Sequence, residues 1–287
     1  MSIRSITKIF NITYYERSKL LYVRFHGCNF NCIFCINKKS IYDTHLPNYI
    51  IKILENQEIK FLNLKDFEKL IQEVLNVFDV DVVSLGGGEP TIDKNLINVV
   101  NILKKHNLKI RLLTNAYLLN EEYIKKLVHH GFDENDIIIV SIKAIDSIKH
   151  KLITGIENST VLSNVKKIYG MGLNLIIETV YVPELLTVED IVNLAKWISE
   201  NLNSEISLII DPYVPIPKQS FRTPTLKELD FLIKHVREYL GSAVCRQLST
   251  EFSHGGYVLC RGIKVGFNSK LIGNIHLVHP ELTISKV

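Results

Sequence analysis

The sequence has no long hydrophobic run and little excess of charge. No uninterrupted apolar stretch reaches the ~18 residues that a membrane-spanning helix needs, so we expect no membrane association. Residues 1–10 carry two basic side chains but no apolar stretch after them, so we expect no signal peptide and a cytoplasmic protein. The net charge is +4, too small to favour nucleic acid as a partner.

Cysteine is scarce and odd in number. Five cysteines among 287 residues fit a reducing compartment better than a full disulfide framework. No internal repeat and no low-complexity stretch is present, which excludes a solenoid. A hydrophobic content of 46% in a chain of this length can supply a substantial core and excludes a disordered chain. The composition thus predicts a globular protein of one large domain or two small ones.

Short β-branched runs alternate with longer amphipathic stretches along most of the chain. The predicted strands are 20–25, 80–85, 109–113, 136–141, 173–182 and 206–210. The predicted helices are 64–77, 96–105, 120–131, 147–153, 161–169, 188–200 and 225–240. Strands separated by helices imply right-handed crossovers and a parallel α/β sheet. Periodicity alone does not say whether the sheet curls into a barrel.

The most informative segment follows the first of these strands. Cys28, Cys32 and Cys35 are separated by three and two residues, so one loop can wrap a single metal centre. Thiolates are ligands of both iron–sulfur clusters and structural zinc. A [4Fe–4S] cluster held by three thiolates keeps one iron open for a small molecule, whereas zinc would need His26 or His45 as a fourth ligand. The cysteines alone leave both centres open.

A glycine-rich turn, Gly86-Gly87-Gly88-Glu89-Pro90, follows the next predicted strand. The carboxyl ends of parallel strands are where α/β sheets place their ligands. Glycines let the backbone approach a ligand closely, and its bare N–H and C=O groups can bind the ammonium and carboxylate of an amino acid. The alternative is a tight strand-to-helix turn with no ligand. A zinc loop gives no reason for this second glycine–glutamate site.

Together, the Cys-x3-Cys-x2-Cys motif and the Gly-Gly-Glu-Pro turn resemble the radical S-adenosylmethionine (SAM) superfamily. The resemblance implies a partial (β/α)6 barrel, and a [4Fe–4S] cluster held by Cys28, Cys32 and Cys35 that binds SAM at its open iron. The SAM contacts that it implies are Phe34 at the adenine, and Gly87, Gly88 and Glu89 at the methionyl amine. It divides the chain into an N-terminal extension (1–19), a barrel (20–240, with an insertion at about 46–63) and a C-terminal extension (241–287).

Within the superfamily, the chain is most similar to the pyruvate formate-lyase activating-enzyme branch, from about Tyr22 to Pro215. The matching segments are Cys35-Ile36-Asn37, Asp43-Thr44-His45, Thr114-Asn115-Ala116, Ser141-Ile142-Lys143, His150 with Gly155, Val182-Pro183 and Pro212-Tyr213. By this resemblance, Thr114, Asn115 and Ser141 are cofactor-binding residues.

Four positions depart from the pattern of that branch. Leu113 and Ser141 replace aspartates, Glu178 replaces an arginine, and Val214 replaces a histidine. The two aspartates help form a monovalent-cation site in activating enzymes, so the resemblance does not extend to that site. These positions surround SAM and the substrate. We therefore expect the cluster and SAM to be kept, whereas glycine-abstracting activity need not be.

Two charged residues are candidates for catalytic roles. Lys143 could pair with the SAM carboxylate or with a substrate anion, or it could be a barrel-end lysine that reaches water. Glu178 lies on a predicted strand between apolar neighbours, where an unpaired charge is costly. It could contact SAM or substrate in the barrel interior, or it could face solvent. We expect Cys245 and Cys260 to be ordinary thiols.

The sequence thus predicts a radical SAM oxidoreductase. It would cleave SAM reductively to a 5′-deoxyadenosyl radical, which abstracts hydrogen from a substrate, a protein or peptide in the manner of activating enzymes. The alternatives are a radical SAM enzyme that modifies a small molecule or RNA, and a non-catalytic iron–sulfur or zinc protein. The expected partners are an electron donor such as a flavodoxin or ferredoxin and a protein or peptide substrate.

Overall fold

The computed structural model describes residues 5–15, 18–44, 46 and 48–246. Within these residues, eight strands form one sheet in the order β1 to β8. The strands are β1 (Ile9–Tyr15), β2 (Leu20–Phe25), β3 (Val82–Gly87), β4 (Lys109–Thr114), β5 (Ile137–Ser141), β6 (Leu175–Tyr181), β7 (Ser207–Pro212) and β8 (Val244–Cys245). Only the β1–β2 pair is antiparallel, and β1 and β8 are not paired with each other, so the sheet is open.

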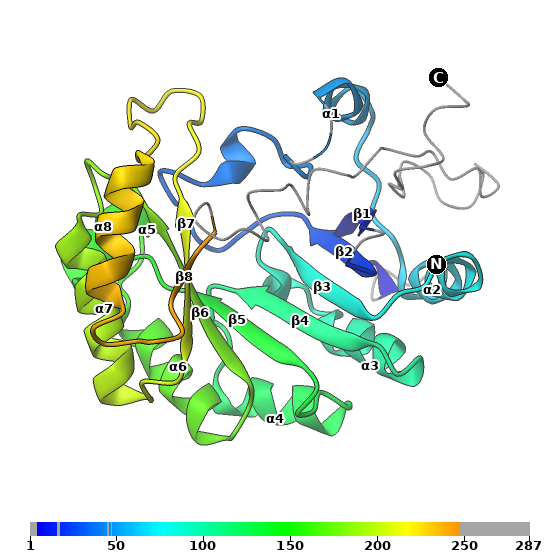
Figure 1. Cartoon of the computed structure of the whole chain (residues 1–287). Coiled ribbons are helices and arrows are strands. Elements are labelled where there is room, and N and C mark those ends of the chain that lie inside the picture. Colours follow the sequence, from blue (N-terminus) through cyan, green and yellow to red (C-terminus); the bar gives the residue numbers. More distant parts are fainter. Residues whose placement is uncertain (1–4, 16–17, 45, 47, 247–287) are drawn as a thin grey trace.

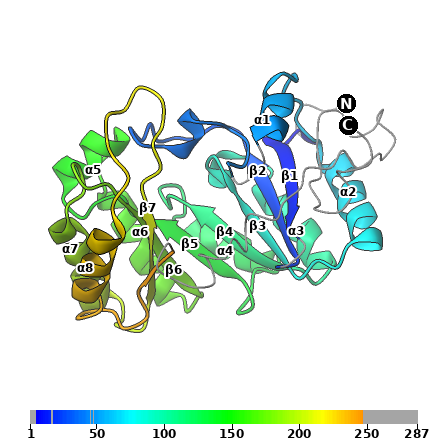
Figure 2. The same ribbon diagram turned by 45° about the horizontal axis from the view of Figure 1, so that its top comes forward.

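Most helices cover the outer side of the curved sheet, whereas the first one, Asn48–Glu55, lies apart from them near β1 (Figure 1). The α-helices are α1 (Asn48–Glu55), α2 (Leu64–Val77), α3 (Leu96–Lys105), α4 (Glu121–His129), α5 (Ser147–Thr154), α6 (Ser159–Gly170), α7 (Val188–Asn201) and α8 (Leu226–Val236). The short 3-10 helices η2 (Ile36–Lys38) and η3 (Pro90–Ile92) follow β2 and β3. The segment between β2 and α1 crosses the open side of the arc toward α5 (Figures 1 and 2). This α/β sheet with its outer helices confirms the predicted partial barrel.

The local sequence explains why these elements form. β5 buries three consecutive residues, Ile138, Ile139 and Val140, as expected of a parallel strand covered on both faces. α2 begins at its cap, where the Asn63 side chain accepts the backbone N–H of Asp66. The buried residues of α2 recur at helical spacing, and this stripe packs into the main hydrophobic core.

The structure agrees with most predicted elements, but it shifts β3 and shortens α8, which was predicted to reach residue 240 and ends at Val236. β2, α2 and α3 begin and end at the predicted residues. β3 was predicted at 80–85 but runs from Val82 to Gly87, because Gly86 and Gly87 pair in parallel register with Arg24 and Phe25. The strand therefore extends into the glycine turn, and this brings that turn beside the end of β2.

Three elements were not predicted from the sequence. β1 lies within the stretch expected to be an N-terminal extension, and all seven of its residues are buried, including Asn11 and Thr13. α1 lies within the expected insertion, and β8 within the expected C-terminal extension. Residues 247–287, with Cys260, lie outside the described residues, whereas Cys245 is buried in the core. In the described part of the chain, no helix has the length and apolarity needed to cross a membrane.

Candidate active site

The three predicted cluster ligands lie on the loop that follows β2. Cys28, Cys32 and Cys35 all line one cavity of about 230 Å³, and their thiols form no disulfide. Cys28 is exposed, and the other two are partly buried. Asn37 and Lys38 also line the cavity, from the turn of η2. The structure therefore brings the cysteines together at the carboxyl edge of the sheet.

The last turn of α5 holds this loop in place. The backbone N–H of Asn31 donates to the carbonyl of Thr154 at 3.0 Å, and that of Ile33 donates to Ile153 at 2.9 Å. The last carbonyls of a helix have no partner within it and are free to accept such bonds. α5 ends at Gly155, whose φ of +85° suits a glycine. The His150–Gly155 segment noted in the sequence is thus a support for the cysteine loop.

The glycine turn packs directly against the start of the same loop. The N–H of Gly88 donates to Phe25 O, and the N–H of Glu89 donates to Gly27 O, each at 2.8 Å. A Cβ on Gly88 would lie 2.0 Å from Gly27 O, so no larger residue fits there without movement of the backbone. Gly87 has a φ of +94°, in the region that favours glycine. The turn needs its glycines even before any ligand is considered.

The Glu89 carboxylate is buried and fully engaged within the protein. Its Oε1 accepts the N–H and hydroxyl of Thr91 at 3.1 and 2.6 Å, and the hydroxyl of Thr114 at 2.7 Å. Its Oε2 accepts the backbone N–H of Asn115 at 2.7 Å. Burial raises the pKa of Glu89, and these hydrogen bonds only partly offset that effect. Glu89 therefore ties the glycine turn to the end of β4, and its contact with SAM stays a prediction.

Two N–H donors lie at the sulfur of Cys28. The backbone N–H of Phe30 donates to Cys28 Sγ at 3.3 Å, and the Asn115 Nδ2 group lies 3.8 Å from it. Asn115 Nδ2 also donates to Asn29 Oδ1 at 2.8 Å. Cys28 is exposed as a residue, but desolvation of its thiol raises the pKa of that thiol to about 11.

Lys143 lies just past the end of β5, near the cysteine loop. Its Nζ donates to Ser141 Oγ, and it forms no ion pair with any described carboxylate. Positive charge at Lys143 lowers the pKa of Cys32, although burial raises that pKa more. Lys143 is thus a partly buried cation that is available to an anionic group.

Glu178 does not face solvent, because Arg246, the residue after β8, binds it. Its side chain is 15% exposed, and Arg246 Nη1 lies 3.1 Å from Glu178 Oε1. The same nitrogen lies 2.6 Å from both carboxylate oxygens of Asp211, on β7. Burial and repulsion by Glu178 raise the pKa of Asp211 well above its usual range. Burial also acts to raise the pKa of Glu178, but the hydrogen bond with Asp211 and the charge of Arg246 lower it.

A comparison with protein families identifies the fold and this site. The family model of the radical SAM superfamily matches residues 22–206, which include the cysteine loop and the glycine turn. The chain belongs to the radical SAM superfamily. Superfamily members are enzymes that use a [4Fe–4S] cluster and SAM, so this chain is an enzyme with these cofactors. Its sequence resemblance to the superfamily is thereby confirmed.

Curated relatives of the chain carry two kinds of name. A "Putative glycyl-radical enzyme activating enzyme" of Methanocaldococcus jannaschii is 28% identical over 206 residues, 68% of this chain and 70% of that protein. A "Probable GTP 3',8-cyclase" of Saccharolobus islandicus is 30% identical over 244 residues, 84% of this chain and 70% of that protein. The first name agrees with the predicted activating-enzyme branch. The second name is that of an enzyme acting on a small molecule, GTP.

Solved structures share the fold of this radical SAM chain. Streptococcus suis SuiB bound to S-adenosylmethionine has a TM-score of 0.59 and 18% identity over 81% of this chain, which spans 49% of SuiB. The native anSMEcpe structure with bound AdoMet has a TM-score of 0.54 and 19% identity, and the match covers 82% of this chain and 63% of the anSMEcpe chain. At such low identity the likeness concerns the fold alone.

The residues at the cavity fit an iron–sulfur cluster better than a zinc ion. Three thiols around one cavity, with N–H donors at Cys28, suit a cluster with hydrogen-bonded sulfurs and one open iron. Zinc gathers its ligands around a single ion. Among the described residues, no three His, Cys, Asp or Glu side chains are placed to hold a single metal ion. His26 packs its ring against Phe10 and Phe61, and His45 lies outside the described residues.

Two further predicted residues of the radical SAM site lie in the interior. Phe34 is 5% exposed and belongs to the hydrophobic core, so its contact with adenine stays a prediction. His150 is fully buried, and its Nδ1 lies 2.7 Å from Ile156 O. Its ring packs edge-on against Phe30 of the cysteine loop at 5.8 Å, and burial lowers its pKa. His150 therefore packs against the cysteine loop, and Phe34 packs into the hydrophobic core.

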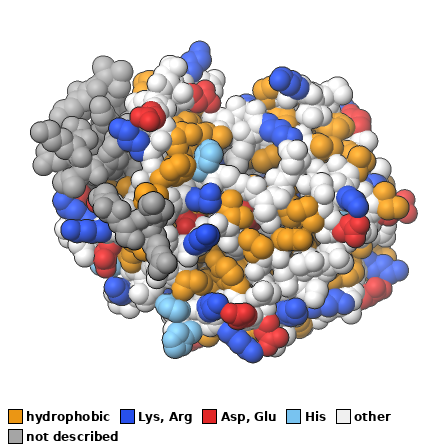
Figure 3. Space-filling model, turned by 180° about the vertical axis from the view of Figure 1, so that it is seen from behind, with side chains coloured by type: hydrophobic (Ala, Val, Ile, Leu, Met, Phe, Trp, Pro, Cys, Tyr) orange, Lys and Arg blue, Asp and Glu red, His pale blue; other side chains and the backbone are white. Residues whose placement is uncertain are grey.

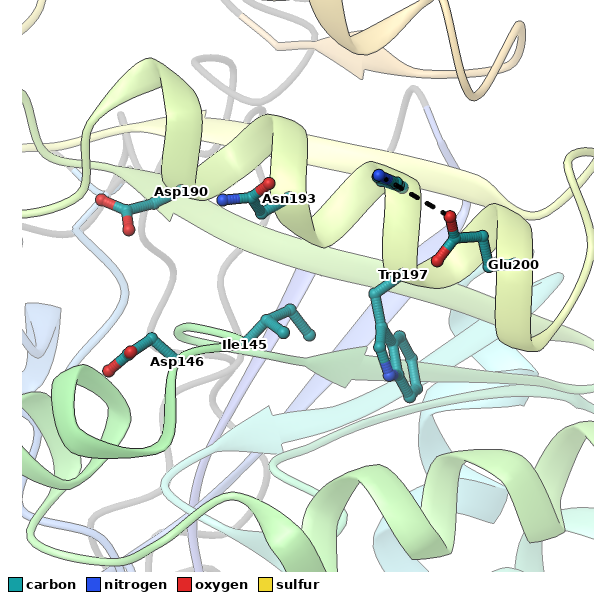
Figure 4. Close-up of a pocket in the computed structure, with 7 residues that line it drawn as sticks. Ile145, Asp146, Asp190, Asn193, Trp197 and Glu200 are labelled. Carbon is teal, nitrogen blue, oxygen red and sulfur yellow. Dashed lines mark ion pairs between the residues drawn. The ribbon is translucent and has the colours of Figure 1, made fainter.

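A second cavity lies away from the radical SAM site. It has a volume of about 360 Å³ and is lined from α7 and from the loop before α5 by residues such as Asp146, Asp190 and Trp197 (Figure 4). No predicted site residue lines it. On the face seen in Figure 3, basic and acidic side chains are interspersed among the described residues, with no broad patch of one sign. Neither feature points to a second functional site.

Sequence reasoning missed Asp211 and Arg246. Asp211 follows an apolar run like any strand end, and Arg246 comes from a stretch with weak patterning. They are 35 residues apart in sequence and meet only because β7 and β8 pair. Thr114 and Ser141, by contrast, end β4 and β5, and Asn115 follows β4, whereas their contact with a cofactor stays a prediction.

Proposed function

We propose that this radical SAM enzyme abstracts hydrogen from a protein or peptide substrate, in the manner of activating enzymes. When bound, the cluster and SAM supply a 5′-deoxyadenosyl radical. The observation that carries this proposal is the joining of Cys28, Cys32 and Cys35 to the glycine turn at one sheet edge. The protein's own residues would hold the cluster, orient SAM and present the substrate.

The metal ligands in this proposal are Cys28, Cys32 and Cys35, and the glycine turn at Gly87 and Gly88 lies beside their loop. The turn bonds to Phe25 O and Gly27 O, so a ligand held by the turn would lie close to the cluster. Lys143 would bind the SAM carboxylate or a substrate anion, because it has no described carboxylate partner. Glu178 would orient substrate through the Asp211–Arg246 cluster rather than as a free anion.

A polypeptide substrate is favoured by two exposed apolar residues of α5, the helix whose last turn bonds to the cysteine loop. Ile148 and Leu152 lie one helical turn apart on α5 and are 82% and 66% exposed. The last carbonyls of the same helix hold the cysteine loop. Large exposed apolar side chains beside a site suit contact with a polypeptide. The M. jannaschii relative, which carries an activating-enzyme name, supports the same class.

A small-molecule substrate is the second candidate. It is favoured by the S. islandicus relative, which is named a GTP 3',8-cyclase and matches 84% of this chain. Positions around SAM and the substrate, such as Glu178, differ from the pattern of the activating branch, and this difference is also compatible with another substrate. GTP itself is the first probe for this candidate.

Transfer of substrate deuterium to SAM-derived 5′-deoxyadenosine separates the two candidates. The enzyme, SAM and dithionite are incubated anaerobically with either the macromolecular or the small-molecule fraction of cells grown in deuterated medium. Mass spectrometry then measures deuterium in 5′-deoxyadenosine, with Cys28→Ala as the control. Deuterium from the macromolecular fraction that is lost on protease treatment of the fraction, but not on ribonuclease treatment, supports the proposal. Deuterium from the small-molecule fraction alone contradicts it, and stimulation by unlabelled GTP would then identify the second candidate.

An electron donor is required by any radical SAM enzyme, and we propose a flavodoxin or ferredoxin. Cys28 is the most exposed of the three ligands, so electrons would enter from its side. Lys38 and Lys39, which follow Cys35, are exposed and form no ion pair with a described residue. These two lysines suit a donor protein with an acidic surface. The rate at which such a donor reduces the cluster should then fall as the salt concentration rises.

A further inference from the structure

We propose that Asn115 is a positioning residue for the cluster. Its carboxamide donates to the Cys28 sulfur and makes the bound cluster easier to reduce. Glu89 holds the backbone of Asn115 in place. The inference rests on the proposed function in that it takes Cys28 as a cluster ligand. It goes further by giving the glycine-turn glutamate a role that does not require contact with SAM.

The side chain of Asn115 can point only one way. Its Oδ1 accepts the backbone N–H of Tyr117 at 3.0 Å, so its Nδ2 group must face the other side. There the two N–H groups meet Asn29 Oδ1 at 2.8 Å and Cys28 Sγ at 3.8 Å. Asn115 is only 7% exposed, so water does not compete freely for these donors. The carboxamide thus spans from β4 to the first ligand.

The backbone of Asn115 is fixed by a buried carboxylate. Glu89 Oε2 accepts its N–H at 2.7 Å, while Oε1 of the same group accepts the hydroxyl of the preceding Thr114. Glu89 is 2% exposed and also binds Thr91. The neighbour on the other side, Ala116, lies with its carbonyl bonded to Asn164 Nδ2 at 2.9 Å. Asn115 therefore cannot withdraw from Cys28 without breaking several buried bonds.

The chemistry of the ligand explains why these donors matter. A thiolate bound to iron keeps negative charge on sulfur, and reduction of the cluster adds more. N–H donors at the sulfur stabilise the more negative form, so they raise the reduction potential. Phe30 N–H and the Asn115 carboxamide both lie at Cys28. The backbone N–H of Phe30 cannot be removed by substitution of a side chain. Asn115 is therefore the donor whose effect on the reduction potential can be tested by mutation.

The test is an EPR-monitored redox titration of the anaerobically reconstituted protein, without SAM or substrate. We compare wild type, Asn115→Ala and Asn115→Asp, with Asn201→Ala at the exposed end of α7 as the control. Iron per chain and thermal unfolding of the metal-free protein are measured in parallel. The potential should shift to more negative values in Asn115→Ala and further in Asn115→Asp, which puts a negative charge where a donor was. Asn201→Ala should match wild type.

Each outcome decides a different question. A cluster of full iron content with an unchanged potential in Asn115→Ala overturns the inference. Loss of the cluster from a variant whose metal-free form unfolds like wild type supports it, because Cys28 has then lost its positioning partner. If Asn115→Ala does not fold, Asn115→Asp decides, since it keeps the bond from Tyr117 N. Failure of the wild-type protein to form any cluster would instead refute the proposed function.

Discussion

Glu89 Oε2 and the backbone nitrogen of Asn115 lie 2.7 Å apart, and their hydrogen bond joins the glycine turn to the end of β4 in the radical SAM site. Glu89 ends the glycine turn, which bonds to the start of the cysteine loop. Asn115 follows β4 and reaches the sulfur of Cys28. Two motifs that are 26 residues apart in sequence are thereby held as one unit. A connected set of hydrogen bonds thus holds the glycine turn, the end of β4 and the cysteine loop together.

Replacement of Glu89 should destabilise the metal-free protein. Glu89→Ala removes four hydrogen bonds and leaves the buried donors of Thr114 and Asn115 unpaired, which costs about 3 kcal/mol of unfolding free energy. Urea unfolding in the absence of SAM measures this cost. Glu122→Ala, at an exposed position of α4, should change stability by less than ~0.5 kcal/mol. A loss below ~1 kcal/mol for Glu89→Ala would mean that the bonds add little.

A side chain at Gly88 should disrupt the contact between the glycine turn and the cysteine loop. Its Cβ would lie 2.0 Å from Gly27 O and 2.8 Å from Phe25 O, both backbone atoms. We expect Gly88→Ala to lose roughly 3 kcal/mol or more and to bind less iron on reconstitution. The matched control is Gly170→Ala at the end of α6, where a Cβ meets nothing within 4 Å. Equal stability of the two variants would contradict the packing described.

Lys143 should matter for ligand binding and not for folding. Lys143→Met removes a cation that has no described carboxylate partner, so the metal-free protein should be as stable as wild type. If Lys143 binds the SAM carboxylate, the Kd for SAM should rise about tenfold or more, the value of a charge-assisted hydrogen bond. Isothermal titration on the reconstituted protein measures this, with Lys125→Met on α4 as the control. Unchanged SAM affinity and unchanged turnover would leave Lys143 as a lysine that only reaches water.

The raised pKa of Asp211 should make stability depend on pH. The folded-state pKa of Asp211 is raised above 3.8, so the stability that it contributes is complete below pH 3.8 and is lost as pH rises through the folded value. Asp211→Asn keeps a donor for Glu178 but cannot ionise. Its unfolding free energy should therefore improve relative to wild type as pH rises from about 4 to about 8. A difference in unfolding free energy that does not change with pH would argue against a raised pKa of Asp211.

Local signals account for the elements that the sequence predicted correctly. α2 has its cap at Asn63 and a stripe of buried residues at helical spacing. Both signals are contained in residues 63–77, so they can be recognised without knowledge of the rest of the fold. β1 has no such signal, because Asn11 and Thr13 interrupt its apolar residues and yet are buried against β2. Its assignment depends on a pairing that periodicity within one segment does not reveal.

The candidate site divides in the same way. The cysteine spacing and the glycine turn are each contained in a few residues, so their chemistry is visible in the sequence. The bond from Glu89 to Asn115 and the ion pairs of Arg246 join separate strands and depend on the register of the sheet. Glu178 thus looked like a lone charge until β8 placed Arg246 beside it.

The most direct test of the account is the formation of 5′-deoxyadenosine from SAM. The protein is reconstituted anaerobically with iron and sulfide, reduced with dithionite and given SAM, and the product is quantified for wild type and for single Cys28, Cys32 and Cys35→Ala variants. We predict product for wild type and none for the three variants, which should also lack the cluster. Retained cleavage in Cys32→Ala, or one zinc and no iron in the natively purified protein, would contradict the assignment of a radical SAM site to these cysteines.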